Sequence, residues 1–203
     1  MDRSDQIVGL ARAAQDASRR VAALSTTLKN EVLLEIADEL DRQRGLLQQE
    51  NQKDVTVARE KKLSPALIDR LTLTDKVITA MIESIREVVH LPDPVGEVVK
   101  MWKRPNDLLV GRVRIPLGVI GIIYESRPNV TVDAASLCFK SGNAVILRGG
   151  KESVHSNRVL TRLMQAVLKK NSIPEAAIQL FPLLEREAVY ELLALEDYID
   201  LII

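Results

Sequence analysis

The sequence is poor in the residues that build disulfide frameworks and metal centres. Its 203 residues include one cysteine, Cys138, and two histidines. A single cysteine excludes an internal disulfide framework and suits a reducing cytoplasm. One cysteine and two separated histidines are too few for a structural zinc site, so we expect no metal site.

Long apolar runs and an excess of one charge are also missing. No apolar run reaches the roughly 18 residues that a membrane helix needs, and residues 1–10 lack the apolar core of a signal peptide. Lys and Arg together number 28, as do Asp and Glu, which gives no indication of nucleic acid or a membrane as a partner. The 46% hydrophobic content is sufficient for a core, and the sequence favours a soluble, cytoplasmic α/β protein.

Residues 1–95 have the apolar spacing of amphipathic helices. Apolar side chains recur three or four positions apart, with charged residues between them. Helix starts are predicted after Ser25, at Ser64 and at Thr74, because serine and threonine are common N-caps. The last of these helices must end near His90, because prolines follow at positions 92 and 94.

Residues 96–117 change to a pattern that is typical of strands. Glu97–Trp102 and Leu108–Ile115 are rich in β-formers and are separated by Pro105-Asn106-Asp107, which predicts a β-hairpin. Its many polar positions indicate that the hairpin is exposed, or that it pairs with something outside this fold.

From residue 118 to residue 203, short apolar segments alternate with amphipathic helices. The predicted strands are Val119–Tyr124, Ala144–Leu147, Ile178–Phe181 and Tyr198–Ile203, and the predicted helices are Val130–Lys140, Val154–Lys169 and Glu185–Leu195. This alternation predicts a Rossmann-like parallel sheet with helices on both faces. The last predicted strand is apolar up to the end of the sequence, so we expect the chain to be part of a longer protein.

Ligands of such a sheet bind beyond the carboxyl ends of its strands. Three segments are expected there: residues 125–129, residues 148–151 and the segment after Phe181. The dinucleotide fingerprint G-x-G-x-x-G is absent. Gly118 and Gly121 lie before or within a strand, where close packing of the backbone explains them better than a phosphate loop.

The segment Arg148-Gly149-Gly150-Lys151 is a better candidate for a ligand site. Its glycines let a ligand approach the backbone, its two cations attract anions, and the next helix could offer its N-terminal amides. A solvated loop with ordinary surface charges has the same composition. The residues alone therefore leave both alternatives open.

Cys138 and the two histidines have ordinary structural explanations. Cys138 lies in the middle of a predicted helix among apolar neighbours, where a cysteine behaves as a small hydrophobic residue rather than a nucleophile. His90 and His155 have no cysteine or carboxylate at a useful spacing, and we interpret them as helix-end or surface residues.

Four motifs, taken in order, closely resemble those of a known enzyme family. They are Ile115–Asn129, Lys140–Ala144, Leu147–Glu152 and His155–Arg158. The chain resembles the γ-glutamyl phosphate reductases of the aldehyde dehydrogenase superfamily, over essentially its whole length. The resemblance implies an N-terminal helical segment (1–95), a hairpin arm for oligomerisation (96–117) and a Rossmann-like NADP-binding region (118–203).

The resemblance also implies an enzymatic reaction for the complete protein. Family members reduce L-glutamyl 5-phosphate with NADPH in proline biosynthesis and release glutamate 5-semialdehyde and phosphate. Their nucleophilic cysteine lies in a further half, which this chain does not include. We therefore expect the isolated chain to hold cofactor determinants without turnover, and the complete enzyme to form a homodimer through the arm.

Site residues follow from the resemblance, position by position. Asn129 matches the asparagine whose amide helps to form the oxyanion hole. The preceding loop differs from the Pro-Trp-Asn of the wider superfamily, and its Ser126 and Arg127 could bind the phosphate or carboxylate of the substrate.

The cofactor residues are expected at Arg148, Gly149, Gly150 and Lys151. Arg148 matches a lysine that contacts the adenosine ribose. Lys151 stands where NAD-preferring relatives often have a glutamate, and a cation there would attract the 2′-phosphate of NADP.

Two other functions compete with the reductase half. The first is a non-catalytic nucleotide-binding or assembly module derived from the same family. The second is a general aldehyde oxidiser of the superfamily, which Lys151 and the Ser126-Arg127-Pro128 loop disfavour.

Overall fold

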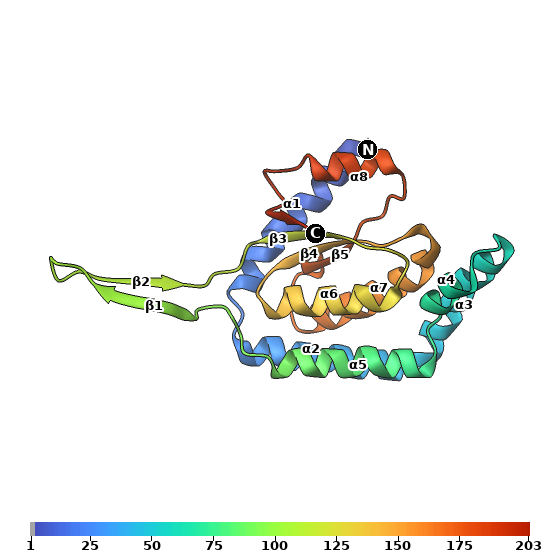
Figure 1. The fold of residues 1–203 in the computed structure, drawn as a ribbon, viewed down its shortest axis with the longest axis horizontal. Helices are drawn as coiled ribbons and strands as arrows, with labels where there is room; N and C mark the ends of the chain where they lie inside the picture. Colours follow the sequence, from blue (N-terminus) through green and yellow to red (C-terminus); the bar gives the residue numbers. More distant parts are fainter. Residues whose placement is uncertain (1–2) are drawn as a thin grey trace.

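A computed structural model describes residues 3–203, which form a layered α/β body with a projecting hairpin (Figure 1). The α-helices are α1 (Arg3–Ala22), α2 (Thr26–Arg42), α3 (Arg44–Glu60), α4 (Pro65–Leu71), α5 (Asp75–His90), α6 (Pro128–Lys140), α7 (Val154–Lys170) and α8 (Arg186–Leu193). The strands are β1 (Val98–Lys103), β2 (Leu109–Val113), β3 (Val119–Ile123), β4 (Ala144–Arg148), β5 (Ile178–Leu180) and β6 (Leu201–Ile202). Two 3-10 turns, η1 (Lys151–Ser153) and η2 (Glu175–Ala177), precede α7 and β5.

The body is built on a parallel sheet with the strand order β5-β4-β3-β6. Val119 of β3 pairs with Ala144 of β4, and Val145 of β4 pairs with Ile178 of β5. Parallel strands require crossover connections, and helices supply all of them here. The predicted fold class is confirmed.

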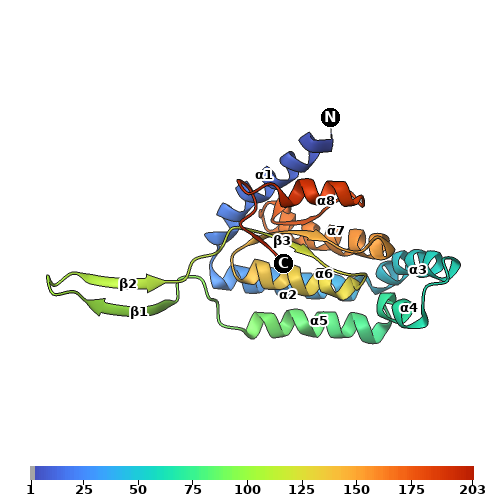
Figure 2. The same ribbon diagram turned by 45° about the horizontal axis from the view of Figure 1, so that its top comes forward.

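Helices cover both faces of this sheet. Helices α1 and α8 lie on one face, and α6 and α7 lie on the other (Figures 1 and 2). Helices α2 and α5 pack outside α6 and α7 as a further layer. Buried β4 residues such as Ile146 and Leu147 face these two sides alternately, so they join two separate hydrophobic clusters.

The three predicted helix starts are confirmed by side-chain caps. In each case the hydroxyl oxygen accepts a hydrogen bond from the backbone amide three residues later, as N-caps do for the amides of the first helical turn. The cap pairs are Ser25–Leu28 at 3.2 Å, Ser64–Leu67 at 3.4 Å and Thr74–Val77 at 3.2 Å. Helix α5 ends at His90, as its following prolines require.

The predicted hairpin is also confirmed. Strands β1 and β2 are antiparallel, with Trp102 opposite Val110, and Asp107 in the turn has a φ of 64°. The hairpin projects away from the body in both views (Figures 1 and 2). Met101 and Leu109 are 55% and 61% exposed, so the hairpin exposes apolar side chains to solvent.

The end of the chain differs from the prediction. Strand β6 covers Leu201–Ile202 rather than Tyr198–Ile203, and among the described strands it pairs with β3. Leu201 is 39% exposed and Ile202 is partly buried. Asp200, just before the strand, bonds to Val119 twice: its carboxylate accepts a hydrogen bond of 2.8 Å from the Val119 amide, and its own amide donates to the Val119 carbonyl at 2.9 Å.

Other boundaries differ by a few residues. Helix α6 begins at Pro128 rather than at residue 130, because proline is favourable in the first helical turn. The two glycines of β3 pack closely, as predicted. A Cβ atom on Gly121 would lie 2.6 Å from Ile202 Cδ1, and one on Gly118 would meet the Asp200 carboxylate.

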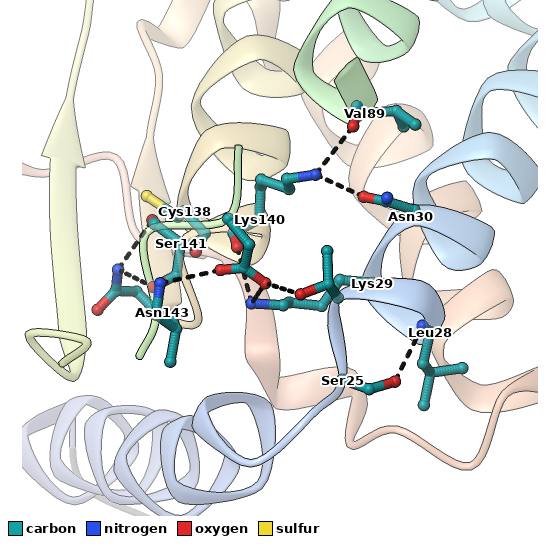
Figure 3. A network of polar contacts seen from close by, with 12 residues as sticks. Ser25, Leu28, Lys29, Asn30, Val89, Cys138, Lys140, Ser141 and Asn143 are labelled. Carbon is teal, nitrogen blue, oxygen red and sulfur yellow. Dashed lines mark hydrogen bonds and ion pairs between the residues drawn. The ribbon is translucent and has the colours of Figure 1, made fainter. Parts of the chain in front are cut away.

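Two buried lysines join the hairpin root to the body (Figure 3). Lys29 of α2 forms an ion pair of 2.5 Å with Asp93 and donates a hydrogen bond of 3.0 Å to the Lys140 carbonyl. Lys140, the last residue of α6, donates to Asn30 Oδ1 and to the carbonyl of Val89. This network, hereafter the lysine network, holds α2, α5, α6 and the segment that leads to β1 together.

Charge in the lysine network is unbalanced in favour of the cations. Burial lowers the pKa of Lys140; the nearby Asp93 carboxylate opposes this shift, and the Lys29 ammonium group adds to it. For Asp93, burial alone would raise the pKa, but hydrogen bonds from Lys29, Val95 and Thr26 together outweigh it and lower the pKa. The Asp93 carboxylate therefore stays ionised beside Lys29 at neutral pH.

Candidate functional site at the carboxyl edge of the sheet

A cleft of about 500 Å³ opens where β3 and β4 end. Its lining comes from three places: α4 with the turn before it, the loop after β3, and the loop after β4. The lining residues are Leu63, Leu67, Arg70, Leu71, Ile123, Tyr124, Glu125, Ser126, Arg127, Arg148, Gly150 and Glu152. Helices α3 and α4 lie at the end of the molecule opposite the hairpin (Figures 1 and 2), so the cleft and the hairpin are far apart.

The cleft brings together four of the predicted site residues. Ser126 and Arg127 come from the loop after β3, and Arg148 and Gly150 come from the end of β4 and the loop after it. Lys151 instead lines a smaller pocket of about 80 Å³ between α3 and η1. The predicted cofactor segment therefore faces two neighbouring pockets.

Direct contacts join the two loops of the cleft. Ser126 Oγ donates a hydrogen bond of 2.6 Å to Glu152 Oε2. Gly150 lies directly beneath this contact, and a Cβ atom there would meet the Ser126 hydroxyl. The loop after β3 and the loop after β4 are thus fitted to each other.

A buried chain of hydroxyl and amide groups links the same two loops. The Tyr124 hydroxyl and Thr131 Oγ1 lie 2.7 Å apart, and Thr131 Oγ1 donates to Asn157 Oδ1 at 2.9 Å. Asn157 Nδ2 then donates to Ser153 Oγ at 3.0 Å, and Ser153 Oγ donates to the Gly150 carbonyl at 3.1 Å. Burial raises the pKa of Tyr124 to about 12, so its hydroxyl stays protonated within this chain.

The space beside Gly149 is filled by protein atoms. The residue is buried, and a Cβ atom there would meet Asn157 Nδ2 and would approach the Tyr124 ring to 3.1 Å. Close packing between the two loops is therefore one reason for glycine at this position.

Arg148 is held in place by two carbonyl groups. Its Nη1 donates to the Gly149 carbonyl at 3.2 Å, and its Nη2 donates to the Leu184 carbonyl at 3.0 Å. Its Nε atom is buried and has no hydrogen-bond partner among the residues that the structure describes. A buried N–H group without a partner is costly.

The amides at the start of α7 already have an acceptor, contrary to the prediction that they could attract a ligand anion. The carboxylate of Asp54, on α3, accepts from the His155 amide at 3.1 Å and from the Ser156 amide at 2.8 Å. It also accepts from Ser156 Oγ at 2.7 Å. A helix N-terminus favours a negative charge, and here a carboxylate about a hundred positions earlier in the chain provides it.

Asn129 lies in the first turn of α6, half-buried beside a carboxylate. Its Nδ2 donates a hydrogen bond of 3.3 Å to Asp133 Oδ2, and Ser84 of α5 donates to Asp133 Oδ1 at 2.8 Å. The amide of Asn129 is thus oriented through Asp133 from the outer helical layer.

Cys138 is buried on α6, as predicted, at 5% exposure. Burial raises the pKa of its thiol to about 12, which keeps the sulfur protonated and weakly nucleophilic. His90 is the last residue of α5, as predicted. His155 lies in the first turn of α7, as predicted, and its side chain is 40% exposed. The structure adds a neighbour from α3 that sequence spacing did not reveal, because Glu50 Oε2 lies 3.8 Å from His155 Nδ1.

None of the described helices has both the length and the apolar character needed to cross a membrane. The described His, Cys, Asp and Glu side chains do not gather into a group of three or more that could hold a metal ion.

Sequence reasoning missed three residues that shape the site: Asp54, Arg70 and Glu152. Asp54 and Arg70 lie on helices whose patterns show only amphipathic character, and no local signal connects them with the cleft. Glu152 stands beside the predicted segment 148–151, and its nearness to the glycines was the one available signal.

Known proteins were compared with the chain at the levels of sequence and structure. No protein-family model matches it. The γ-glutamyl phosphate reductases of Desulfatibacillum aliphaticivorans and Citrifermentans bemidjiense are each 52% identical to it over 203 residues, which are 100% of this chain and 49% of theirs. The chain therefore spans about half the length of the curated relatives that it matches.

Solved structures agree with these sequence matches. The γ-glutamyl phosphate reductase of Thermotoga maritima has a TM-score of 0.94 and 39% identity, over 97% of this chain and 47% of its own. That of Saccharomyces cerevisiae has a TM-score of 0.88 and 33% identity, over 100% of this chain and 51% of its own. A probable aldehyde dehydrogenase of Listeria monocytogenes, at 16% identity over 100% of this chain and 42% of its own, has a TM-score of 0.74 and shows the shared fold alone.

Proposed function

We propose, from its homology over the full length to about half of the γ-glutamyl phosphate reductases, that this chain is the N-terminal, cofactor-binding half of such an enzyme. The complete protein then reduces L-glutamyl 5-phosphate with NADPH and yields glutamate 5-semialdehyde, phosphate and NADP⁺, as a step of proline biosynthesis. The observation that carries the proposal is the cleft at the carboxyl edge of the parallel sheet, which brings Ser126 and Arg127 together with Arg148 and Gly150.

The residues around the cleft fit a phosphorylated nucleotide. Arg148 has a buried Nε–H without a partner among the described residues, and its position at the end of β4 is where dinucleotides bind in related sheets. Gly149 and Gly150 form the adjoining backbone. Lys151, on the neighbouring pocket, supplies the cation that a 2′-phosphate requires. When bound, NADPH supplies the hydride of the proposed reaction.

The remaining assigned residues act on the substrate. Ser126 and Arg127 bind its anionic groups, and the amide of Asn129, oriented by Asp133, donates to the oxygen on which negative charge develops. Cys138 is not assigned the role of nucleophile, because it is buried and its pKa is about 12.

The hairpin provides the contact for a homodimer in this proposal. It exposes apolar side chains and two strand edges, which could pair with another copy of the protein. The proposal places the enzyme in the cytoplasm, and it includes neither nucleic acid nor a membrane as a partner. The alternative is a non-catalytic nucleotide-binding or assembly module that uses the same cleft.

Calorimetric titration with NADPH and NADH tests the proposal. We expect NADPH to bind about tenfold more tightly than NADH, because a charge-assisted contact with the 2′-phosphate contributes on the order of 1.5–3 kcal/mol. Lys151→Glu should remove this preference, whereas Lys76→Glu on α5 makes the same charge change away from the cleft and should keep it. No binding of either nucleotide to the wild-type chain would refute the cofactor assignment.

An activity assay tests whether the isolated chain is inactive on its own, as the proposal requires. We expect no phosphate-dependent reduction of NADP⁺ with glutamate 5-semialdehyde from the isolated chain, nor from a Cys138→Ser variant. Turnover that is lost in the variant would make Cys138 the nucleophile and would contradict the proposal.

A further inference from the structure

Arg70 of α4 brings a positive charge from the N-terminal helices to the cleft. It lines the cleft together with Arg127 and Arg148, although 57 residues separate it from the nearer of these in sequence. Neither Arg70 nor Arg127 has an ion pair or a side-chain hydrogen bond among the residues that the structure describes. Both guanidinium groups are therefore available to a ligand.

A buried side-chain amide, that of Asn51, fixes helix α4, which carries Arg70, against the start of α7. Asn51 Nδ2 donates to the Leu71 carbonyl at 2.8 Å and to Ser156 Oγ at 3.0 Å, and Asn51 Oδ1 accepts from the Leu73 amide at 2.8 Å. Asn51 is only 3% exposed. The residue next to Arg70 is thus tied to the start of α7, and the position of α4 beside the cleft is set in advance of binding.

The charges on the cleft favour an anion. Three guanidinium groups face two carboxylates, Glu125 and Glu152, and Glu152 already accepts the hydrogen bond from Ser126. Leucine side chains of α4 and the turn before it form an apolar wall beside these charges.

The arrangement suits a phosphoryl group better than a carboxylate. A planar carboxylate can be satisfied by one guanidinium in a bidentate pair, whereas a phosphoryl group has three oxygens and up to two charges. We propose that Arg70 and Arg127, from two different parts of the chain, form a binding site for a phosphoryl dianion in this cleft. This inference rests on the proposed function only for the identity of the ligand, which is either the 2′-phosphate of NADPH or the acyl phosphate of the substrate.

Inorganic phosphate, NADPH and NADH serve as probes of the full chain. Binding of phosphate is measured as the rise in thermal unfolding temperature, against chloride and acetate at equal ionic strength. Binding of the nucleotides is measured by calorimetry. The variants are Arg70→Gln, Arg70→Lys and the control Arg20→Gln, which removes an exposed arginine of α1 away from the cleft. Circular dichroism checks that each variant is folded.

We expect Arg70→Gln to weaken phosphate binding by about tenfold or more, the usual size of a charge-assisted contact, and Arg70→Lys to restore it in part. Arg20→Gln should leave it unchanged. If the ligand is the 2′-phosphate, Arg70→Gln also weakens NADPH and spares NADH. If the ligand is the acyl phosphate, both nucleotides keep their affinity and only phosphate binding falls.

Other outcomes would overturn the site. One is that Arg70→Gln changes phosphate binding by less than about twofold. Another is that acetate stabilises the chain as strongly as phosphate does. The third is that phosphate does not stabilise the wild-type chain. Failure of the proposed function is a separate result, because a chain that binds phosphate through Arg70 and binds neither nucleotide would keep this site and lose the cofactor assignment.

Discussion

Replacing Asp93 by asparagine would leave the ammonium group of Lys29 buried without a carboxylate. The two charges lie 2.5 Å apart, and their side chains are 1% and 8% exposed. Asparagine keeps the shape of the side chain, but its single amide oxygen can replace only one of the two carboxylate oxygens, which accept from Thr26 and from Val95, so the substitution removes the charge and one acceptor. Lys29 would retain only uncharged partners such as the Lys140 carbonyl.

We expect Asp93→Asn to lower the free energy of unfolding by about 3–5 kcal/mol, the usual loss when one partner of a buried ion pair is removed. Such a loss is a large part of the roughly 5–15 kcal/mol that stabilises a typical domain. It should shift the midpoint of urea unfolding by on the order of 1–2 M.

The effect should depend on pH in a defined direction. The pKa of Asp93 is lowered in the folded state, so its contribution is fully present above its unfolded pKa of about 4 and is lost as pH falls through the lower folded value. The difference between wild type and Asp93→Asn should therefore be full near pH 7 and should narrow below about pH 4.

Two further variants make the test specific. Asp107→Asn removes the partner of Lys103 in an exposed ion pair of the same 2.5 Å length, and should change stability by less than about 1 kcal/mol. Lys29→Met added to Asp93→Asn removes the unpaired charge and should recover much of the loss. An Asp93→Asn variant within about 1 kcal/mol of wild type at pH 7 would refute this account of the lysine network.

Three other predictions concern the site and the core. Cys138 should resist a thiol reagent at pH 8, because a pKa of about 12 leaves roughly one thiol in ten thousand ionised. Rapid labelling of Cys138 in the native chain would contradict its burial. Gly149→Ala should destabilise the chain by about 1–3 kcal/mol through overpacking against Asn157, whereas Gly9→Ala on α1, with open space around it, should be neutral or stabilising in the same urea titration. Ser126→Ala and Glu152→Gln should show a coupling of about 1 kcal/mol in a double-mutant cycle, and strict additivity would show that their contact is not formed in solution.

The amino-acid sequence by itself determined the elements and their class. The caps at Ser25, Ser64 and Thr74, the strand pattern of the hairpin and the alternation after residue 118 are local features, and each was confirmed. Local features suffice because capping, turn chemistry and apolar periodicity act within a few residues of the chain. The same reasoning found the loops of the site, because parallel strands end at one edge of a sheet.

Tertiary structure alone decided which groups face those loops. It placed Asp54 on the amides of α7, where the sequence predicted room for a ligand anion, and it brought Glu50 to His155. It also carried Arg70 into the cleft and paired Lys29 with Asp93. These contacts join residues up to about a hundred positions apart, and they depend on how helices pack against the sheet. Amphipathic spacing shows which face of a helix is buried, but the partner on the other side is set by packing.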